Sequence, residues 1–532
     1  MYDLLIKNGM VIDGSGKEAF PADIAISNGK IAKLAPSIND EARETIDAKG
    51  KTVTPGFIDI HRHADVNLFT ESFGEPELHQ GLTTIINGNC GLSVVPCPKK
   101  YRDEIFPMLQ SVIGTVPEDE DKYFETFEEY IDVVKRTKLP LNVGMDIGNG
   151  TTRAASNGYT PGKLSKEAME RAKSYLRTSL EAGALAVTLG IIYSPENCYD
   201  KDDFVEVLSP MKDFDVPLVT HIRGEGDIFI ESLEEVIYIA KKLGVRLHVS
   251  HFKCIGERNW GHVTRKARAL LDSARENGLE VTCDVYPYRA GSTQLIQVLP
   301  PEFLEGGSEG ICKRLAIREE RDKLTQILKT PSTEFENLVS SIGWDNIVMA
   351  TLTKEHNQKY MGKTVTEIAK MQGKDPYECA YDMLIDENCK ISMIDYIVSE
   401  DDIKENLQYP YSAVISDSVY PTGGKWHPRL FGTFTKIIET YVLKDHIFSL
   451  EEAVRKMTYF PASVYKLEGK GLIKEGYDAD INIFVPENIK SPASFEDPHQ
   501  LSSGFDYVII AGNKALVDDK LTGIKVGKVI TK

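Results

Sequence analysis

The chain has 532 residues, and 80 acidic against 62 basic side chains give it a formal net charge of -18. A chain of this length suits one large α/β barrel with an accessory domain. The acidic balance, with no basic run interleaved with aromatic residues, disfavours a nucleic-acid or anionic-membrane surface, so we expect a small molecule as the partner.

No stretch of the sequence holds about 18 uncharged apolar residues in a row, and the N-terminus lacks the apolar core of a signal peptide. We therefore expect no membrane span and a cytoplasmic location. The eight cysteines show no disulfide-framework spacing. Each is expected to be reduced, either as a buried small residue or as a ligand. Nothing in the pattern indicates an oligomeric state.

The two ends of the chain share a pattern of short alternating segments. Residues 1–55 contain "IAISNGKIAKL", in which Asn28 and Gly29 fit a type I′ hairpin turn. After about residue 472 the pattern returns in "ADINIFV" and "YVIIAGNKALVDD". Neither end alone has enough strands to bury a face, so we predict a small β-sandwich domain built from residues 1–55 and 472–532.

Residues 56–471 alternate apolar strand-like runs with helical stretches, which predicts an α/β fold of the (β/α)8 TIM-barrel type. The eight runs are "GFIDI" at Gly56, "GLTTII" at Gly81, "LNVGMDI" at Leu141, "ALAVTLG" at Ala184, "VPLVT" at Val216, "VRLHVS" at Val245, "LEVTCDVY" at Leu279 and "SAVIS" at Ser412. More than a hundred residues separate the last two runs. We expect an insertion there, at about 291–362.

In a TIM barrel, the residues just past the C-terminal end of each strand line the active-site mouth. Here these positions hold metal-ligating or titratable side chains: His61 and His63 after the first run, Cys90 after the second, His221 after the fifth, His251 after the sixth and Asp417 after the eighth. The i, i+2 spacing of His61 and His63 places both imidazoles on one face of an extended chain. Imidazole and thiolate are ligands that zinc prefers, and a nearby aspartate can act as the base for bound water. The convergence predicts a zinc site at the barrel mouth.

Other histidines and cysteines have structural alternatives. A lone histidine near a strand end is more often a hydrogen-bonded structural residue, and His248, on the opposite strand face from His251, is assigned to packing. A buried free cysteine usually acts as a small hydrophobic residue. Cys97 and Cys254 compete with Cys90 for the ligand role, but neither ends a strand.

The motifs resemble those of the D-aminoacylase (N-acyl-D-amino-acid deacylase) family within the amidohydrolase superfamily. In order they read "GFIDIHRHAD", "GNCGLS", "THIRGE", "SHFKCIGERNWG", "VYPYRAGST", "SDS" and "HPRLFGTF". The H-x-H motif alone marks only the superfamily, whereas "NCG" with "SHFK" and "YPY" is more specific. The resemblance implies a tightly bound zinc held by Cys90, His221 and His251. It implies a second, weaker site at His61 and His63, whose occupancy stays open.

Many amidohydrolases bridge two metals with a carboxylated lysine at the end of the fourth strand. This chain reads "AVTLGIIYSP" there, with no lysine. The departure fits the D-aminoacylase pattern, in which a cysteine matching Cys90 takes the bridging place.

The resemblance implies a zinc-dependent hydrolase that cleaves the amide bond of N-acyl-D-amino acids. Asp417 would take the proton of the attacking water and pass it to the departing amine. Arg429, if it is not an ordinary surface arginine, would grip the substrate carboxylate through its guanidinium fork. Lys253, Tyr286 and Ser292 match the family's other substrate-contacting positions.

Two other functions stay open. A cyclic amidase of hydantoinase or dihydroorotase type is disfavoured by the missing fourth-strand lysine. A non-catalytic scaffold on the same fold would be expected to have lost its ligands. The preference for D over L substrates rests on resemblance, and no motif identifies the acyl group or the amino-acid side chain.

Overall fold

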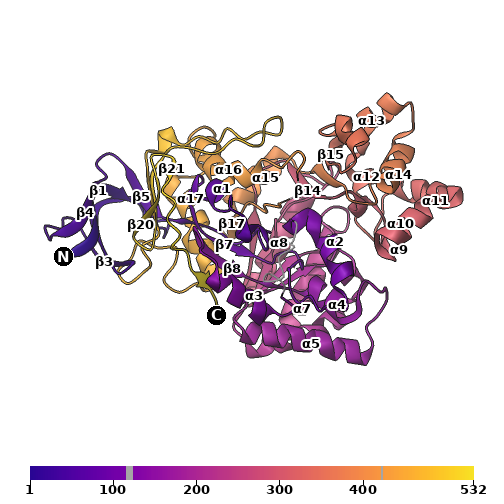
Figure 1. Cartoon of the computed structure of the whole chain (residues 1–532), viewed down its shortest axis with the longest axis horizontal. Coiled ribbons are helices and arrows are strands. Elements are labelled where there is room, and N and C mark those ends of the chain that lie inside the picture. Colours follow the sequence, from indigo (N-terminus) through magenta and orange to yellow (C-terminus); the bar gives the residue numbers. More distant parts are fainter. Residues whose placement is uncertain (115–123, 421–422) are drawn as a thin grey trace.

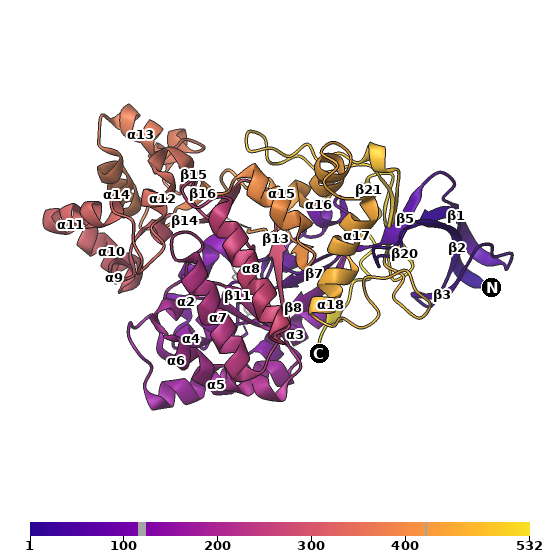
Figure 2. The ribbon, with the colours of Figure 1, turned by 180° about the vertical axis from the view of Figure 1, so that it is seen from behind.

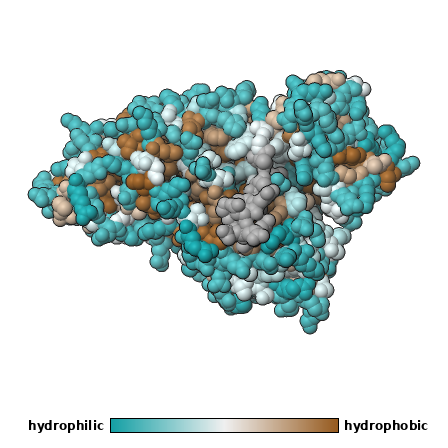
Figure 3. All heavy atoms as spheres, in the orientation of Figure 1, coloured by the Kyte–Doolittle hydropathy of each residue, from teal (hydrophilic) through white to brown (hydrophobic). Residues whose placement is uncertain are grey.

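The computed structural model describes residues 1–114, 124–420 and 423–532. Figure 1 shows strands from the chain ends at one side of the molecule, an α/β body in the middle and the helices α9–α14 at the opposite side. Figure 2 shows the same order from behind. Hydrophilic residues cover most of the face in Figure 3, with apolar residues in patches between them. Among the helices of the described residues, none is both long and apolar enough to cross a membrane.

Strands from both chain ends share a sheet with the order β21-β20-β19-β18-β5-β1-β2-β3, in which β4 also pairs with β1. They are β1 (Tyr2–Val11), β2 (Phe20–Ser27), β3 (Lys30–Ala35), β4 (Ala42–Asp47), β5 (Thr52–Pro55), β18 (Ile481–Phe484), β19 (Phe505–Ile510), β20 (Asn513–Val517) and β21 (Lys520–Leu521). The C-terminal strand β18 pairs antiparallel with the N-terminal strand β5. One apolar cluster contains side chains of both ends, including Ile6, Ile24 and Ile483. The two ends therefore bury their apolar side chains together.

The expected hairpin is confirmed. Strands β2 and β3 pair antiparallel, and Ser27 lies opposite Lys30. Asn28 and Gly29 between them have φ of 52° and 73°. A type I′ turn requires positive φ at both of its central residues, and asparagine and glycine tolerate it best.

Each of the predicted apolar runs contains a strand. They are β6 (Phe57–Asp59), β7 (Leu82–Asn87), β8 (Asn142–Met145) with β9 (Ile147–Gly148), β10 (Val187–Gly190), β11 (Leu218–His221), β12 (Leu247–Val249), β13 (Val281–Val285) and β17 (Ser412–Val414). They pair in parallel as β6-β7-β8 and as β9-β10-β11-β12-β13-β17. The third run joins the two arrays, and a parallel bridge between Arg62 and Ser418 joins their far edges. These parallel pairings are consistent with a barrel.

The body also contains helices, several of which pack against these strands. They are α1 (Glu75–Leu78), α2 (Arg102–Ile113), α3 (Phe127–Arg136), α4 (Asn149–Asn157), α5 (Lys166–Glu181), α6 (Lys201–Val207), α7 (Phe229–Leu243), α8 (His262–Glu276), α15 (Glu400–Gln408), α16 (Arg429–Lys436), α17 (Leu450–Met457) and α18 (Tyr459–Val464). Every residue of β7, β8, β10 and β11 is buried. Strands covered on both faces read as continuous apolar runs, which is the pattern seen in the sequence.

The last strand, β22 (Val529–Ile530), departs from the expectation that residues 472–532 all join the terminal domain. It pairs in parallel with β8, and Val529 lies opposite Val143. The chain pairs with β10 only after Met145, through β9, so the edge of β8 is open to another strand. The C-terminal strand satisfies the backbone groups of that edge.

Residues 290–396, between β13 and β17, form an inserted body of helices and a three-stranded sheet. It contains β14 (Ala290–Gln294), β15 (Ile347–Thr351) and β16 (Ser392–Tyr396), and the helices α9 (Pro301–Leu304), α10 (Gly307–Leu315), α11 (Arg318–Leu328), α12 (Leu338–Ile342), α13 (Val365–Gln372) and α14 (Pro376–Asp386). Strand β16 pairs antiparallel with both β14 and β15. This body therefore runs past residue 362, the end expected from the sequence, because its central strand comes last in the chain.

Candidate metal centre

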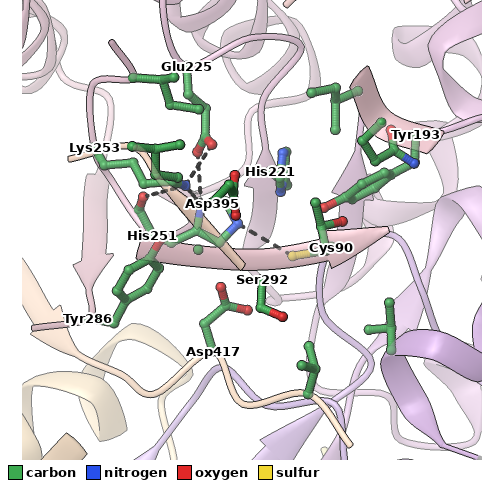
Figure 4. A pocket seen from close by; sticks show the side chains of 18 of the residues that line it. Cys90, Tyr193, His221, Glu225, His251, Lys253, Tyr286, Ser292, Asp395 and Asp417 are labelled. Atoms are coloured by element: carbon green, nitrogen blue, oxygen red, sulfur yellow. Dashed lines mark hydrogen bonds and ion pairs between the residues drawn. The ribbon is translucent and has the colours of Figure 1, made fainter. Parts of the chain in front are cut away.

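The strand ends bring the predicted ligands together. In the part of the chain that the structure describes, their donor atoms form two groups, each with all atoms within 4.8 Å of one another: His61, His63, Cys90 and Asp417, and Cys90, His221 and His251. Every member is buried. Cys90 belongs to both groups, and Figure 4 shows it facing the same pocket as His221, His251 and Asp417.

Three of these residues have a left-handed backbone. Cys90, His251 and Asp417 have φ of 55°, 34° and 52°. For a residue with a Cβ this conformation costs on the order of 1–2 kcal/mol, and such strain clusters at functional sites. Backbone contacts hold it: the Asp417 N–H donates to the carbonyl of His61 over 3.0 Å, and the His251 N–H donates to the Asp284 carboxylate.

Cys90 lies at the centre of the cluster. Its Sγ is 3.2 Å from Nε2 of His61 and 3.5 Å from Nε2 of His251. Burial opposes ionisation, but the charge of His61 and the neighbouring histidines hold the pKa of the Cys90 thiol well below its ordinary value. The site therefore favours the thiolate, which is the form that binds metal.

The turn that carries Cys90 lies on the end of the fourth predicted strand, β10. Thr188 Oγ1 accepts the Gly91 N–H over 3.1 Å and donates to the carbonyl of Gly88 over 2.6 Å. A Cβ at Gly190 would lie 2.0 Å from the carbonyl oxygen of Cys90. The strand end thus has no room for a long side chain at this position, and the cysteine turn occupies the space beside it.

His221 has the properties of a neutral imidazole ligand. Neither of its ring nitrogens has a hydrogen-bond partner among the described residues, and Nδ1 of His63 also lacks one. Burial lowers the pKa of His221, which favours the unprotonated ring. Buried polar atoms without a partner are costly. A metal ion would satisfy them, and sulfur with imidazole nitrogen is a donor set that fits zinc.

Glu225 orients His251 towards Cys90. Its Oε1 lies 2.9 Å from Nδ1 of His251, and its Oε2 accepts from Lys253 Nζ over 2.6 Å. Burial opposes ionisation, but Lys253 and His251 lower the pKa of Glu225 to about 2. The ionised carboxylate accepts the N–H of Nδ1, so Nε2 faces Cys90 and can bind a metal. Carboxylates often fix metal-binding histidines in this way.

Asp284, near the end of β13, contacts His61 of the metal cluster and also His248. Its Oδ2 is 3.3 Å from Nδ1 of His61 and 2.9 Å from Nε2 of His248. Nδ1 of His248 lies 2.7 Å from Thr282 Oγ1. Both ring nitrogens of His248 are thus occupied by protein atoms, and this residue lies behind the metal cluster. Asp284 was missed from the sequence because it lies one residue before the end of its strand.

Arg429 is not a surface residue. Its side chain is 1% exposed, and its Nη1 pairs with Asp417 Oδ2 over 2.8 Å. Oδ1 of Asp417 lies 3.4 Å from Nε2 of His61 and of His63. Burial opposes ionisation of Asp417, but Arg429 and then His61 hold its pKa well below the usual range. The guanidinium also lies over the Tyr286 ring, 5.3 Å from its centre.

One pocket joins the cluster to the predicted substrate residues. Its lining contains His63, Cys90, His221, His251, Lys253, Tyr286, Ser292 and Asp417. His61 and Arg429 are not among the lining residues, but both contact Asp417, which lines the pocket. The lining also contains Tyr193 and Asp395, which the sequence analysis missed. The Tyr193 ring is tilted against that of His221, with ring centres 4.9 Å apart, while Asp395 lies on β16 in a segment without any motif.

Comparison with known proteins agrees with this geometry. The amidohydrolase family model matches residues 44–283 and 333–514. The chain belongs to the amidohydrolase family. The enzyme is 28% identical to D-aminoacylase of Alcaligenes xylosoxydans xylosoxydans, over 100% of this chain and 98% of that one. It is 29% identical to N-acyl-D-aspartate deacylase of the same organism, over 99% and 95% of the two chains.

A solved structure supports the same assignment. The crystal structure of N-acyl-D-glutamate deacylase from Bordetella bronchiseptica, complexed with zinc and a phosphonate inhibitor, matches with a TM-score of 0.84 and 27% identity, covering 100% of both chains. The resemblance to the D-aminoacylase family is confirmed, and with it the α/β amidohydrolase fold. The protein is a hydrolytic enzyme that acts on amides.

Proposed function

We propose that the enzyme is a zinc-dependent hydrolase of linear N-acyl-D-amino acids, which releases a carboxylate and a free D-amino acid. The observation that carries the proposal is the group formed by Cys90, His221 and His251 beside Asp417, in a pocket that also contains Lys253. The similarity to D-aminoacylase and to the N-acyl-D-aspartate and N-acyl-D-glutamate deacylases supports this substrate class.

Cys90, His221 and His251 would hold the tightly bound zinc, and His61 and His63, with Cys90 and Asp417, would form a second, weaker site. The thiolate and the unpartnered nitrogens of His221 support this assignment. When bound, zinc lowers the pKa of water towards neutrality and polarises the amide carbonyl.

Asp417 would be the general base and acid. Its ion pair with Arg429 keeps it ionised, so it can accept the proton of the attacking water. It would then deliver this proton to the nitrogen of the scissile amide. The proton is needed because a free amide anion is too basic to leave.

Arg429, Lys253, Tyr286 and Ser292 would bind the α-carboxylate of the substrate. Nη1 of Arg429 pairs with Asp417, Nη2 donates to the carbonyl of Ser292 over 3.4 Å, and the buried Nε has no partner among the residues described. Lys253 Nζ lies 5.7 Å from the centre of the Tyr286 ring. The guanidinium would therefore be shared between the base and the substrate, which couples substrate binding to catalysis.

The alternatives fit less well. A lysine-bridged cyclic amidase is disfavoured because the turn of Cys90 lies against Gly190 where the bridging side chain would stand. A non-catalytic scaffold is disfavoured by the complete ligand set. The cytoplasmic location and the absence of a nucleic-acid partner stay predictions of the sequence.

Metal analysis of the purified enzyme, combined with hydrolysis assays, tests the proposal. We expect bound zinc and hydrolysis of N-acetyl-D-amino acids, with the L-enantiomers cleaved far more slowly. A hydantoin and dihydroorotate serve as cyclic controls. Preferential cleavage of a cyclic substrate, or of the L-enantiomers, would contradict the proposal, and a protein that binds no metal and cleaves none of them would favour the scaffold.

A further inference from the structure

Asp395 is a carboxyl group that the inserted body contributes to the pocket. It lies on the central strand β16, opposite Gly291 of β14 and Ile347 of β15. The residue is 3% exposed and lines the same pocket as Cys90 and His221. Figure 4 shows it among the side chains that line this pocket. The parallel strands supply the metal cluster, whereas Asp395 comes from the segment between β13 and β17.

Gly291, which has no Cβ, leaves one oxygen of Asp395 without a close neighbour on its side. A Cβ at Gly291 would lie 3.0 Å from Oδ1 of Asp395 and 3.5 Å from the hydroxyl of Tyr286. In the described part of the protein, Oδ1 is buried and has no hydrogen-bond partner. A buried acceptor without a partner is destabilising, and a donor on a bound ligand would remove this cost.

The pocket cations are already paired with other carboxylates. Lys253 pairs with Glu225 over 2.6 Å, and Arg429 pairs with Asp417 over 2.8 Å. Against the effect of burial, Lys253 and Arg429 lower the pKa of Asp395 only through their charges, and the charge of Glu225 opposes them. Burial raises the pKa of Asp395 to about 7, so above this pH the carboxyl is an anion without a direct cationic partner.

The chemistry of the proposed substrate indicates which part of it would meet Asp395. The α-carboxylate would be repelled by Asp395 and is attracted by Arg429 and Lys253. The acyl group of a simple N-acyl amino acid offers neither a positive charge nor a donor. The amino-acid side chain is the part that can supply either.

We propose that Asp395 is a specificity residue that binds a hydrogen-bond donor or a positive charge on the substrate's amino-acid side chain and disfavours acidic side chains. This inference rests on the proposed function and specifies its substrate class. It distinguishes this enzyme from relatives named for N-acyl-D-aspartate and N-acyl-D-glutamate. A second carboxylate held near an anionic Asp395 would meet like-charge repulsion, which is a common means of rejecting a wrong ligand.

N-acetyl-D-glutamine and N-acetyl-D-glutamate test the inference, because they have the same shape and differ in one donor and one charge. At pH 8.5 the wild type should favour glutamine in kcat/KM by about 100-fold, and Asp395→Asn should reduce this preference to less than about 10-fold. The side chain of N-acetyl-D-methionine has no donor or charge. Its kcat/KM should therefore differ by less than about 3-fold between the wild type and Asp395→Asn. Ser392→Ala, on the same strand but outside this pocket, should keep the wild-type ratio.

Asp395→Glu is the control for a folding defect in Asp395→Asn. It keeps the negative charge, so it should still favour N-acetyl-D-glutamine. Hydrolysis with an unchanged glutamine-to-glutamate ratio in Asp395→Asn would overturn the inference and leave the proposed function intact. Absence of hydrolysis of all N-acyl-D-amino acids would overturn the proposed function. Calorimetry with free D-glutamine and D-glutamate, which contain no scissile amide, measures binding separately from hydrolysis. We expect the wild type to bind D-glutamine more tightly than D-glutamate, and Asp395→Asn to lose this preference. Equal selectivity in the two proteins would contradict the inference.

Discussion

Arg429 and Asp417 form a buried ion pair, with 2.8 Å between Nη1 and Oδ2. Asp417 follows β17, and Arg429 is the first residue of α16. Of the neighbouring charges, that of Arg429 lowers the pKa of Asp417 most. The arginine therefore supports the proposed base, and its Nη2 donates to the carbonyl of Ser292, which lines the pocket. Its support of the base and its proposed contact with the carboxylate can be separated by the choice of substrate.

Arg429→Met should lower kcat/KM for N-acetyl-D-amino acids by about 30- to 1000-fold, which corresponds to a loss of roughly 2–4 kcal/mol of transition-state binding. The part of this loss that comes from the substrate carboxylate should vanish for the C-terminal amides of the same substrates. Arg429→Lys is the matched control, since it keeps the charge but loses the fork. Equal losses on acids and amides would mean that Arg429 acts only through Asp417, and Lys253 would become the leading carboxylate partner.

Cys90→Ala should lose the tightly bound zinc and nearly all activity, because the thiolate is shared by both donor groups. Cys254→Ala is the control. Cys254 is also buried, but burial raises the pKa of its thiol, and it lies outside both groups. Elemental analysis after dialysis measures the zinc content. A full complement of zinc in Cys90→Ala would remove this cysteine from the ligand set.

Asp417→Asn should keep the zinc held by Cys90, His221 and His251 while kcat falls by about 100- to 10,000-fold, because the amide can neither accept the water proton nor deliver it. Its thermal midpoint should fall, because the variant leaves Arg429 buried without its anionic partner. Steady-state kinetics with metal analysis on the same sample separates this effect from loss of metal. If the variant retained more than about a tenth of the wild-type kcat, the base would have to be reassigned. Glu225 would be the next candidate, with Glu225→Gln as its test.

Glu336 connects the inserted body to the loop that carries Glu225. It precedes α12, and its Oε2 accepts the backbone N–H groups of Glu225 and Gly226 over 2.7 and 2.6 Å. Burial raises its pKa from 4.5 to about 7. A raised carboxyl pKa contributes stability that is fully present below pH 4.5 and is lost as the pH rises through about 7.

The free energy of unfolding should fall by about 3 kcal/mol between pH 4.5 and about 7 because of Glu336, since one pKa unit corresponds to about 1.4 kcal/mol. Glu336→Gln stays neutral and keeps an oxygen acceptor, so it should escape this loss. Thermal unfolding of both proteins at pH 5, 6, 7 and 8, with the same metal content, measures the difference. We expect the midpoint of Glu336→Gln to rise relative to the wild type with increasing pH. A constant difference across this range would show that Glu336 does not titrate there.

The sequence by itself determined the strand runs and the residue types at their ends. Largely apolar runs such as "ALAVTLG" and "VPLVT" fold as parallel strands because both faces are covered. Parallel strands place their C-terminal ends at the same edge, so the expected fold type was enough to predict that His61, Cys90, His221, His251 and Asp417 lie near one another. The turn at Asn28 and Gly29 was predictable for a similar reason, since positive φ is a local property.

Only the tertiary structure decided which distant groups face one another. The pattern of "ISMIDYIV" indicates a strand, but it does not show that β16 lies between β14 and β15 or that Asp395 faces the metal cluster. The pairing of β22 with β8 and the ion pair between Arg429 and Asp417 likewise depend on the final packing. Local sequence sets the backbone conformation and the periodicity of side chains. A strand edge or a buried charge needs a partner from elsewhere in the chain, and many remote groups could supply one. The packing of the whole chain selects the partner that satisfies the buried polar atoms.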